Sequence, residues 1–253
     1  FAGNLPVVIQ KNGEVNEPFA PVRSSSCNIG VVSRHLLTDL YSSDKQEIKV
    51  KVEKVNKTDS TITNLFEGYL TPNTYSQSLS PNLDNIDMTA IDPVSMLKYL
   101  YIDDILEKSR TISMGELIAR ALAAVKIDID ELWIEDNVKY DGTKTLVDML
   151  VQTNNFWDEG GDGMTMYAAV GECLRLFGYT LVFTGDKYMI YSVMTDHTFG
   201  TTYRDFIRYR IEDGGVLSGV IGRPQIKKSD FHFIHSEGDW TTIDDSPSLS
   251  IDD

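Results

Sequence analysis

The stretch FEGYLTPNTYSQSLSPNLDNIDMTAID, residues 66–92, decides how the chain is divided. It begins with the end of one strand, continues as a polar loop punctuated by Pro and Asn, and ends in a strand with alternating apolar residues. Asp92 and Pro93 follow the pattern of an N-cap residue with Pro at the first helical position. The stretch therefore predicts two neighbouring strands and then a helix that opens a second region.

The segments before this stretch also have strand patterns. Residues 48–55, IKVKVEKV, alternate apolar and charged side chains, which is typical of a half-exposed antiparallel strand. Residues 27–33 and 62–70 are rich in β-branched and aromatic side chains. Residues 27–92 therefore predict a meander of antiparallel strands that forms a small barrel or sandwich.

Two amphipathic helices are predicted after the strands. In residues 111–126, Ser113 and Glu116 have the spacing of a capping box. A second helix over residues 165–177 ends before Gly178, which suits the C′ position of a helix. Two further strand patterns, YTLVFT and KYMIYSV, flank a Gly-Asp pair and predict a hairpin.

These patterns predict an α+β fold: an antiparallel β-barrel or sandwich domain with an inserted or following α/β region. The expected parts are an antiparallel β domain at 1–92, an α/β region at 93–195, and returning strands with an acidic tail at 196–253. A strand expected at 206–211 is predicted to complete the first barrel. The Ser-rich tail is expected to be mobile, or ordered only by a partner.

The charge of the chain restricts its partners. It has 38 acidic and 23 basic residues among 253, a formal net charge of −15. Nucleic acids and anionic membranes attract clustered Lys and Arg, so neither is expected as a direct partner. No apolar run approaches the roughly 20 residues of a membrane span. The two cysteines, Cys27 and Cys173, are too few for a disulfide framework and are expected to be free thiols.

Acidic residues offer candidate sites, each with a simpler interpretation. The loop DEGGDG at 158–163 could supply carboxylates to Ca²⁺, but it lacks the ligand spacing of an EF-hand, which favours a solvated turn. A glycosidase requires two carboxyl groups about 5–10 Å apart, which sequence does not show. A solvated acidic face is therefore favoured for the other candidates: Asp103, Asp104, Asp128, Asp130, Glu131, Glu135 and Asp136.

Nucleophilic and metal-binding patterns are weak. Residues 24–27, SSSC, could pair with His35, but nothing marks a nucleophile elbow or an oxyanion hole. His232 and His235 lie three apart in an apparent strand, so they are expected on opposite faces and not on one metal ion. The sequence therefore predicts no catalytic residue, no metal site and no cofactor.

The strongest indication of function is a resemblance carried by three regions in order. They are CNIGVVS with LLTDLYSSDKQEIKVKV, then FEGYLTPNTYSQSL with IDMTAIDPVSMLK, then TMYAAVGECLRLFGYTLVFTGDKYMIYSV. Together they resemble tail or baseplate proteins of phages and prophages from gut Bacteroidetes. In such proteins a strand ending FEGYL-P or WEGYL-P precedes a loop, a strand ending TA-D and a short helix. An amphipathic helix that ends near Phe-Gly follows later, and a hairpin comes after it. The resemblance covers about residues 20–195.

This resemblance implies a hub-like fold in which a β-barrel lies beside an inserted α/β region. It implies a structural, non-enzymatic component of a virion tail or baseplate, made in the cytoplasm of a bacterial host. The implied partners are other tail proteins and further copies of the chain in a trimeric or hexameric ring. The resemblance is structural, so it assigns no functional residue.

Two other functions stay open from the residues. A cell-surface or carbohydrate-binding module would use aromatic side chains near turns and strand ends, such as Trp133, Trp157 and Trp240. Such aromatic residues more often occupy half-buried positions in the core. A tail-associated hydrolase would need a bound metal ion or a cleft with two facing carboxylates.

Overall fold

In the computed structural model the chain forms two compact units. Unit 1 contains Phe1–Asn12, Ser24–Pro93 and Glu237–Asp253, and unit 2 contains Gly13–Arg23 and Val94–Ser236. Unit 2 is thus inserted between segments of unit 1. The residues that the structure describes are 6–12, 20–35, 37–72, 75–77, 84–136, 139, 142–192, 203–227, 240–242 and 249–250.

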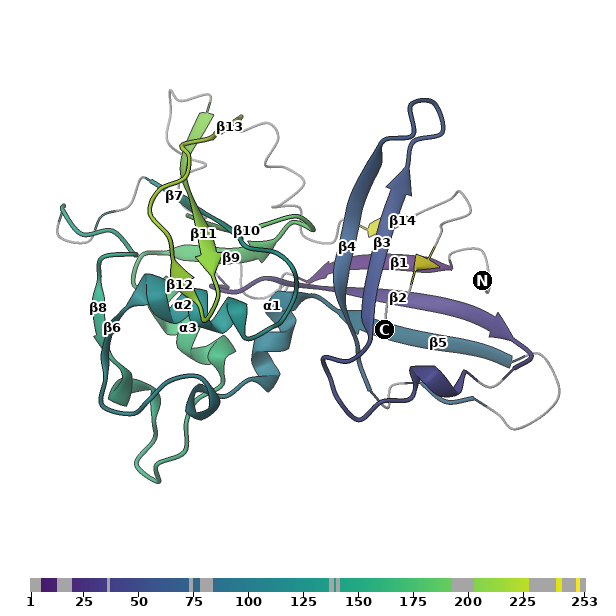
Figure 1. Cartoon of the computed structure of the whole chain (residues 1–253), viewed down its shortest axis with the longest axis horizontal. Coiled ribbons are helices and arrows are strands. Elements are labelled where there is room, and N and C mark those ends of the chain that lie inside the picture. The colour runs from purple at the N-terminus through teal and green to yellow at the C-terminus, as the bar shows by residue number, and fades with distance from the viewer. Residues whose placement is uncertain are drawn as a thin grey trace. The chain divides into compact units, whose positions relative to one another are not determined.

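Unit 1 is built on one seven-stranded antiparallel sheet (Figure 1). Its strands are β1 (Val7–Asn12), β2 (Ser24–Ser33), β3 (Lys49–Val55), β4 (Ile62–Leu70), β5 (Asp84–Ile91), β14 (Trp240–Thr242) and β15 (Leu249–Ser250), in the order β14-β1-β2-β5-β4-β3-β15. A short 3₁₀ helix, Thr38–Leu40, precedes β3. Side chains from β1 to β5 fill one core cluster, which includes Ile29, Val50, Phe66 and Met88. The alternation of apolar residues in the sequence therefore has its expected cause, a sheet with one buried face.

The two strands of the stretch at 66–92 form as its sequence predicts, whereas residues 73–74 and 78–83 of the predicted loop lie outside the described residues. β4 and β5 are neighbours, and α1 (Pro93–Met96) follows directly. The buried carboxylate of Asp92 accepts hydrogen bonds from the N–H of Ser25 at 2.6 Å and from its hydroxyl at 2.9 Å. The start of β2 and the end of β5 are therefore joined through one side chain.

The described sheet of unit 1 does not close into a barrel, which was one of the two forms that the sequence predicted. The edge strands of the described sheet, β14 and β15, pair with β1 and β3 and not with each other. β5 pairs with β2 along eight residues, whereas it pairs with β4 only at Tyr69↔Ile91 and Leu70↔Ala90. Figure 1 shows the β3–β4 hairpin crossing β2 and β5 steeply. The sheet bends here, where the ladder between β4 and β5 has only two residue pairs, and it stays open because its edge strands do not pair with each other.

Unit 2 carries a second, mixed sheet, two longer helices and most of α1. Its main sheet consists of β7 (Glu131–Glu135), β9 (Tyr179–Phe183), β10 (Tyr188–Ser192), β11 (Tyr203–Glu212) and β12 (Val216–Leu217), in the order β12-β11-β7-β10-β9, with β13 (Gln225–Lys227) also on β11. β6 (Thr111–Ser113) and β8 (Leu150–Gln152) form a separate pair. β7 and β10 are parallel, and the other pairs are antiparallel. Short 3₁₀ helices lie at Leu97–Tyr99, Ile102–Asp104 and Thr153–Phe156.

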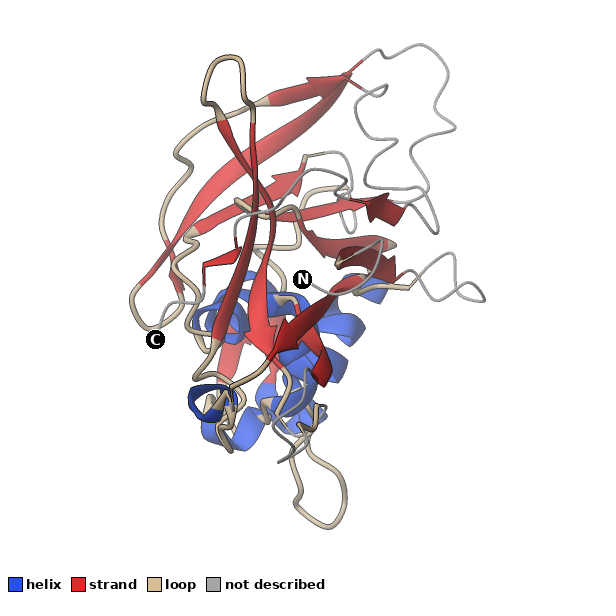
Figure 2. Ribbon diagram, turned by 90° about the vertical axis from the view of Figure 1, so that its right-hand side faces the viewer, coloured by secondary structure: helices blue, strands red, loops and turns tan. Residues whose placement is uncertain are grey.

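Each of the two longer helices of unit 2 begins after a side chain that caps it, and the cap at Ser113 was predicted. The hydroxyl of Ser113 accepts the N–H of Glu116 at 3.0 Å at the start of α2 (Met114–Ala123). The hydroxyl of Thr165 accepts the N–H of Ala168 at the start of α3 (Met166–Arg175). The helices pack against each other and against β11 and β9, and Figure 2 shows them in blue. The predicted hairpin of β9 and β10 is confirmed.

The prediction that the later strands complete the first sheet is wrong for β11. The strand expected at 206–211 exists, but it pairs with β7 in unit 2. Its register brings Ile207 opposite Ile134 and Tyr209 opposite Leu132, so its apolar residues extend the core of unit 2. Part of the tail that was expected to be mobile forms β14 and β15, which pair with unit 1. Alternation in a strand predicts a buried face, but not the sheet that buries it.

We expect Gly68→Ala to destabilise unit 1. A Cβ at this position in β4 would lie 2.1 Å from the carbonyl oxygen of Ile91, so the bend between β4 and β5 would have to open. Overpacking of this kind lowers the free energy of unfolding by about 1–3 kcal/mol. Calorimetric thermal unfolding measures the effect. Gly219→Ala is the control, because nothing lies within 4 Å of its Cβ position. Equal unfolding curves for the two variants would contradict the prediction.

Candidate functional site

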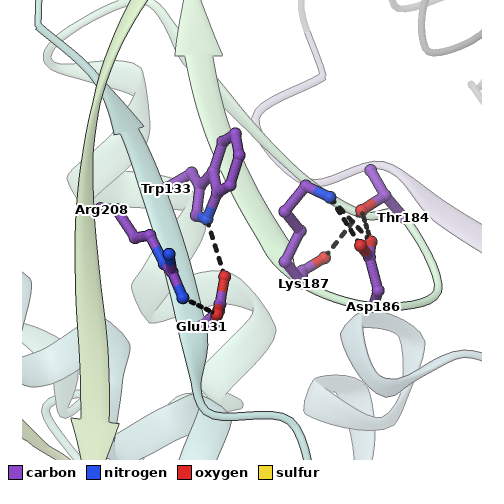
Figure 3. Close-up of polar contacts among 6 residues, drawn as sticks. All are labelled: Glu131, Trp133, Thr184, Asp186, Lys187 and Arg208. Carbon is purple, nitrogen blue, oxygen red and sulfur yellow. Dashed lines mark hydrogen bonds and ion pairs between the residues drawn. The ribbon is translucent and has the colours of Figure 1, made fainter. Parts of the chain in front are cut away.

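Unit 2 presents an aromatic side chain framed by charges on one face of its sheet (Figure 3). Trp133 on β7 pairs with Met189 on β10 and with Arg208 on β11. Its ring lies 6.3 Å from that of Phe206, and it packs on a small apolar cluster of Val182, Met189, Tyr191 and Phe206. Trp133 itself is half-buried. The sheet thus holds the indole ring at the boundary between core and solvent.

Two pairs of opposite charges border this indole ring. The indole N–H of Trp133 donates to the Glu131 carboxylate at 3.1 Å, and the same carboxylate binds the Arg208 guanidinium. On the other side the Lys187 ammonium lies 4.9 Å from the centroid of the ring, and it pairs with Asp186 at 2.7 Å. Trp and Arg are the residues most enriched at energetically important positions of protein interfaces. The arrangement is suited to contact with a partner protein.

A second candidate surface of unit 2 is a shallow hollow of about 460 Å³. It is lined by the contiguous residues 103–108 and by Trp157, which follows the 3₁₀ helix Thr153–Phe156. The sequence singled out Asp103, Asp104 and Trp157, and the structure brings them together across more than fifty residues of chain. The Lys108 ammonium lies 5.9 Å from the centroid of the Trp157 ring.

The loop at 158–163, which was considered for Ca²⁺, closes on itself. The Asp158 carboxylate accepts the N–H of Asp162 at 2.9 Å, and the Asp158 N–H donates to the carbonyl of Asp162 at 3.0 Å. Gly163 donates its N–H to the carboxylate of Asp103 at 3.3 Å. Within the described part of the chain, no group of three or more His, Cys, Asp or Glu side chains is placed to hold a metal ion.

Most of the acidic candidates near β7 bind basic side chains. Asp130 pairs with Arg210 at 2.9 Å, and Asp136 pairs with Arg223 at 3.1 Å. Both pairs join the segment around β7 to residues more than seventy positions later. These carboxylates therefore act in the packing of unit 2. Asp128 alone of the group near β7 is exposed and forms no ion pair with a residue that the structure describes. Sequence inspection could not find these pairs, because each partner comes from a distant strand.

Among the ion pairs in the described part of unit 2, the one between Glu135 and Arg204 is the most buried. Each residue is only 3% exposed, and the charged groups lie 3.4 Å apart. The Arg204 guanidinium also donates to the carbonyl of Ser192 at 3.0 Å, and the Ser192 N–H donates to the Glu135 carboxylate at 2.7 Å. The guanidinium lies 5.6 Å from the ring of Tyr191. These contacts satisfy charges whose burial alone would be costly.

The structure separates the residues considered as a nucleophile and its base. Cys27 is fully buried in the core of unit 1, and burial raises the pKa of its thiol to about 12, so the thiolate does not form at neutral pH. His35 lies beyond Ser33 at the other end of β2, about 20 Å further along the strand. Cys27 and Cys173 are both free, as predicted, and both are buried. His232 and His235 lie outside the described residues, as does the Trp240 side chain.

Comparisons with known proteins give remote structural likenesses. No family model matches the chain, and no curated protein matches it. The 43 kDa tail protein of prophage MuSo2 from Shewanella oneidensis is similar with a TM-score of 0.40 and 13% identity, over 75% of this chain and 50% of that one. A tail protein from Neisseria meningitidis MC58 is similar with a TM-score of 0.41 and 12% identity, over 74% and 46%. The chain thus spans about half the length of each, and likenesses this remote do not establish a common function.

None of the helices in the described ranges is both long enough and apolar enough to cross a membrane.

We expect Arg204→Met to destabilise unit 2, because it leaves the Glu135 carboxylate buried without its cation. Removing one partner of a buried pair lowers the free energy of unfolding by about 3–5 kcal/mol. Adding Glu135→Gln should recover part of the loss, since the amide oxygen can still accept the Ser192 N–H. Denaturant unfolding measures all variants.

Arg223→Met is the matched control for this experiment. It breaks the pair with Asp136, but the Arg223 side chain is 65% exposed, so we expect a change of at most about 1 kcal/mol. If Arg204→Met destabilised the protein no more than Arg223→Met, the buried pair would not be important for stability.

Proposed function

We propose that the chain is a structural component of a phage or prophage tail or baseplate that assembles through protein–protein contacts. One observation carries the proposal. The regions that resemble tail proteins in sequence fold, in the same order, into the elements that the resemblance implies. Residues 66–70 and 84–91 lie in the neighbouring strands β4 and β5, and the short helix α1 follows them. Residues 166–175 form the amphipathic helix α3, and β9 and β10 form the hairpin.

Exposed apolar side chains support a role in assembly. Val216, Val220 and Ile221 lie in one short segment of unit 2 and are 41–52% exposed. Tyr99 and Tyr101 lie in another and are 42% and 50% exposed. Single apolar residues on a surface are ordinary, but groups of them mark surfaces that bind other proteins. Partner subunits would remove these side chains from water.

The charge of the chain restricts how it can assemble. Copies that each carry a formal charge of −15 repel one another, so a ring needs matched local contacts. The proposed partners are copies of this chain, in a hub-like ring of three or six, and other tail proteins. The proposed location is the virion tail, after synthesis in the cytoplasm of the bacterial host. Direct contact with nucleic acid or membrane is not part of the proposal.

A carbohydrate-binding module is the second candidate function. The feature that favours it is Trp157, a half-buried aromatic residue beside carboxylates in an open hollow. Aromatic rings stack on the apolar faces of sugars, and carboxylates accept hydrogen bonds from their hydroxyl groups. This function requires no self-assembly, so oligomeric state and glycan binding distinguish the two candidates.

We expect the purified chain to form a discrete trimer or hexamer as its concentration rises. Light scattering across a concentration series measures the mass, and it should be repeated at low and high salt because screening weakens the repulsion between copies. The decisive addition is a pull-down from lysed phage particles with the chain as bait, with bound proteins identified by mass spectrometry. A monomer at every concentration and salt that retains no tail protein would refute the proposal.

A further inference from the structure

We propose that the hollow formed by residues 103–108 and Trp157 receives a Lys or Arg side chain from a basic segment of a neighbouring tail protein. This inference rests on the proposed function and specifies the chemistry of one partner. Three properties of the hollow support it: a rigid frame, an excess of carboxylates without cationic partners, and an aromatic face that already holds a cation.

The frame of the hollow is fixed by backbone contacts within unit 2. The N–H of Ile102 donates to the carbonyl of Met164 at 3.0 Å, and the N–H of Leu106 donates to the carbonyl of Ile102 at 2.8 Å. The hydroxyl of Thr153 donates to the carbonyl of Glu107 at 2.9 Å. Leu106 is buried and anchors the segment to the core. A partner therefore meets a preformed surface, and less ordering on binding favours affinity.

The hollow and the loop beside it carry six carboxylates that form no ion pair in the described structure: Asp103, Asp104, Glu107, Asp158, Glu159 and Asp162. The contact between Gly163 and Asp103 joins this loop to the hollow. This differs from the acidic residues around β7, several of which bind an arginine. A concentration of uncompensated negative charge attracts a cationic group from solution.

The position of Lys108 shows where a cation can bind. Its ammonium lies 5.9 Å from the centroid of the Trp157 ring and 3.8 Å from the Cβ position of Gly161. The exposed side chain of Lys108 is thus an internal example of a cation between the indole face and the acidic loop. Lys108 supplies one positive charge and the six carboxylates supply six negative charges. A further Lys or Arg side chain in the hollow is therefore electrostatically favourable.

The surroundings of the hollow suit a peptide segment better than a sugar. Tyr101 forms a bridge with Thr165 beside the hollow, and Met164 lies next to it, so exposed apolar groups are present for the aliphatic stem of a Lys or Arg. The carboxylates that line the hollow can only accept hydrogen bonds. A neutral glycan would leave their charge uncompensated, whereas a basic segment would neutralise it.

The test uses a fluorescein-labelled peptide of alternating Arg and Gly, with binding followed by fluorescence polarisation. The double variant Asp104→Asn/Glu107→Gln should weaken binding by about tenfold, because both removed charges line the hollow. Glu212→Gln/Asp213→Asn is the matched control, with the same change of net charge at two exposed acids outside the hollow. It should change binding by less than about twofold.

Trp157→Leu separates docking at the hollow from general attraction to an acidic protein. It leaves the net charge unchanged, and it should weaken peptide binding by about threefold through loss of the aromatic face. Thermal unfolding of Trp157→Leu and of the original chain shows whether the variant folds. If it does not fold, the double variant Asp104→Asn/Glu107→Gln still tests the proposal. Equal weakening by the two double variants would overturn the proposal. Saturable binding of chitotriose that the hollow variants abolish would overturn it in favour of a glycan site.

The outcome is separable from that of the proposed function. A chain that assembles and retains tail proteins, but binds the peptide no better than the hollow variants do, refutes this inference alone. A chain that binds the peptide at the hollow, but neither assembles nor retains tail proteins, refutes the role in the tail.

Discussion

The carboxylate of Glu135 is the point on which unit 2 depends. It lies at the end of β7, binds the guanidinium of Arg204 on β11, and accepts the N–H of Ser192 at the end of β10. β7 is parallel to one of these strands and antiparallel to the other, and both come from much later in the chain. Because a buried charge without partners is costly, the three strands are held in the one arrangement that satisfies it.

Unit 1 uses a carboxylate in a similar way. Asp92 is buried where the chain leaves β5, and it binds both the N–H and the hydroxyl of Ser25 at the start of β2. The chain passes between the two units at these same points, since unit 2 contributes the residues just before Ser24 and just after Pro93. The contact therefore holds together the two places in unit 1 between which the chain of unit 2 is inserted. These places lie next to the bend where β4 approaches β5 at Gly68.

The two surfaces of unit 2 that carry tryptophan differ in how their charges are balanced. Around Trp133, each cation has a carboxylate partner, so that surface is close to neutral and offers shape and apolar contact. Around Trp157, carboxylates outnumber the single ammonium of Lys108. A protein that assembles through several contacts can use both kinds of surface, because paired charges give specificity of fit while unpaired charges select a partner by its sign.

The sequence by itself determined the local elements of this protein. The strands predicted at 62–70 and 85–91, the cap at Ser113, the second helix and the β9–β10 hairpin all follow from periodicity and end signals that act over a few residues. Candidate residues such as Asp103 and Trp157 could also be named from sequence, but not their meeting in one hollow. Only the tertiary structure decided that β11 extends the second sheet. It also decided that β14 and β15 form the edges of the first sheet without closing it, and which arginine each carboxylate near β7 binds. Those outcomes depend on pairing between segments that are distant in the sequence. Alternation predicts that a strand has a buried face, but the competition among possible neighbouring strands selects its partner.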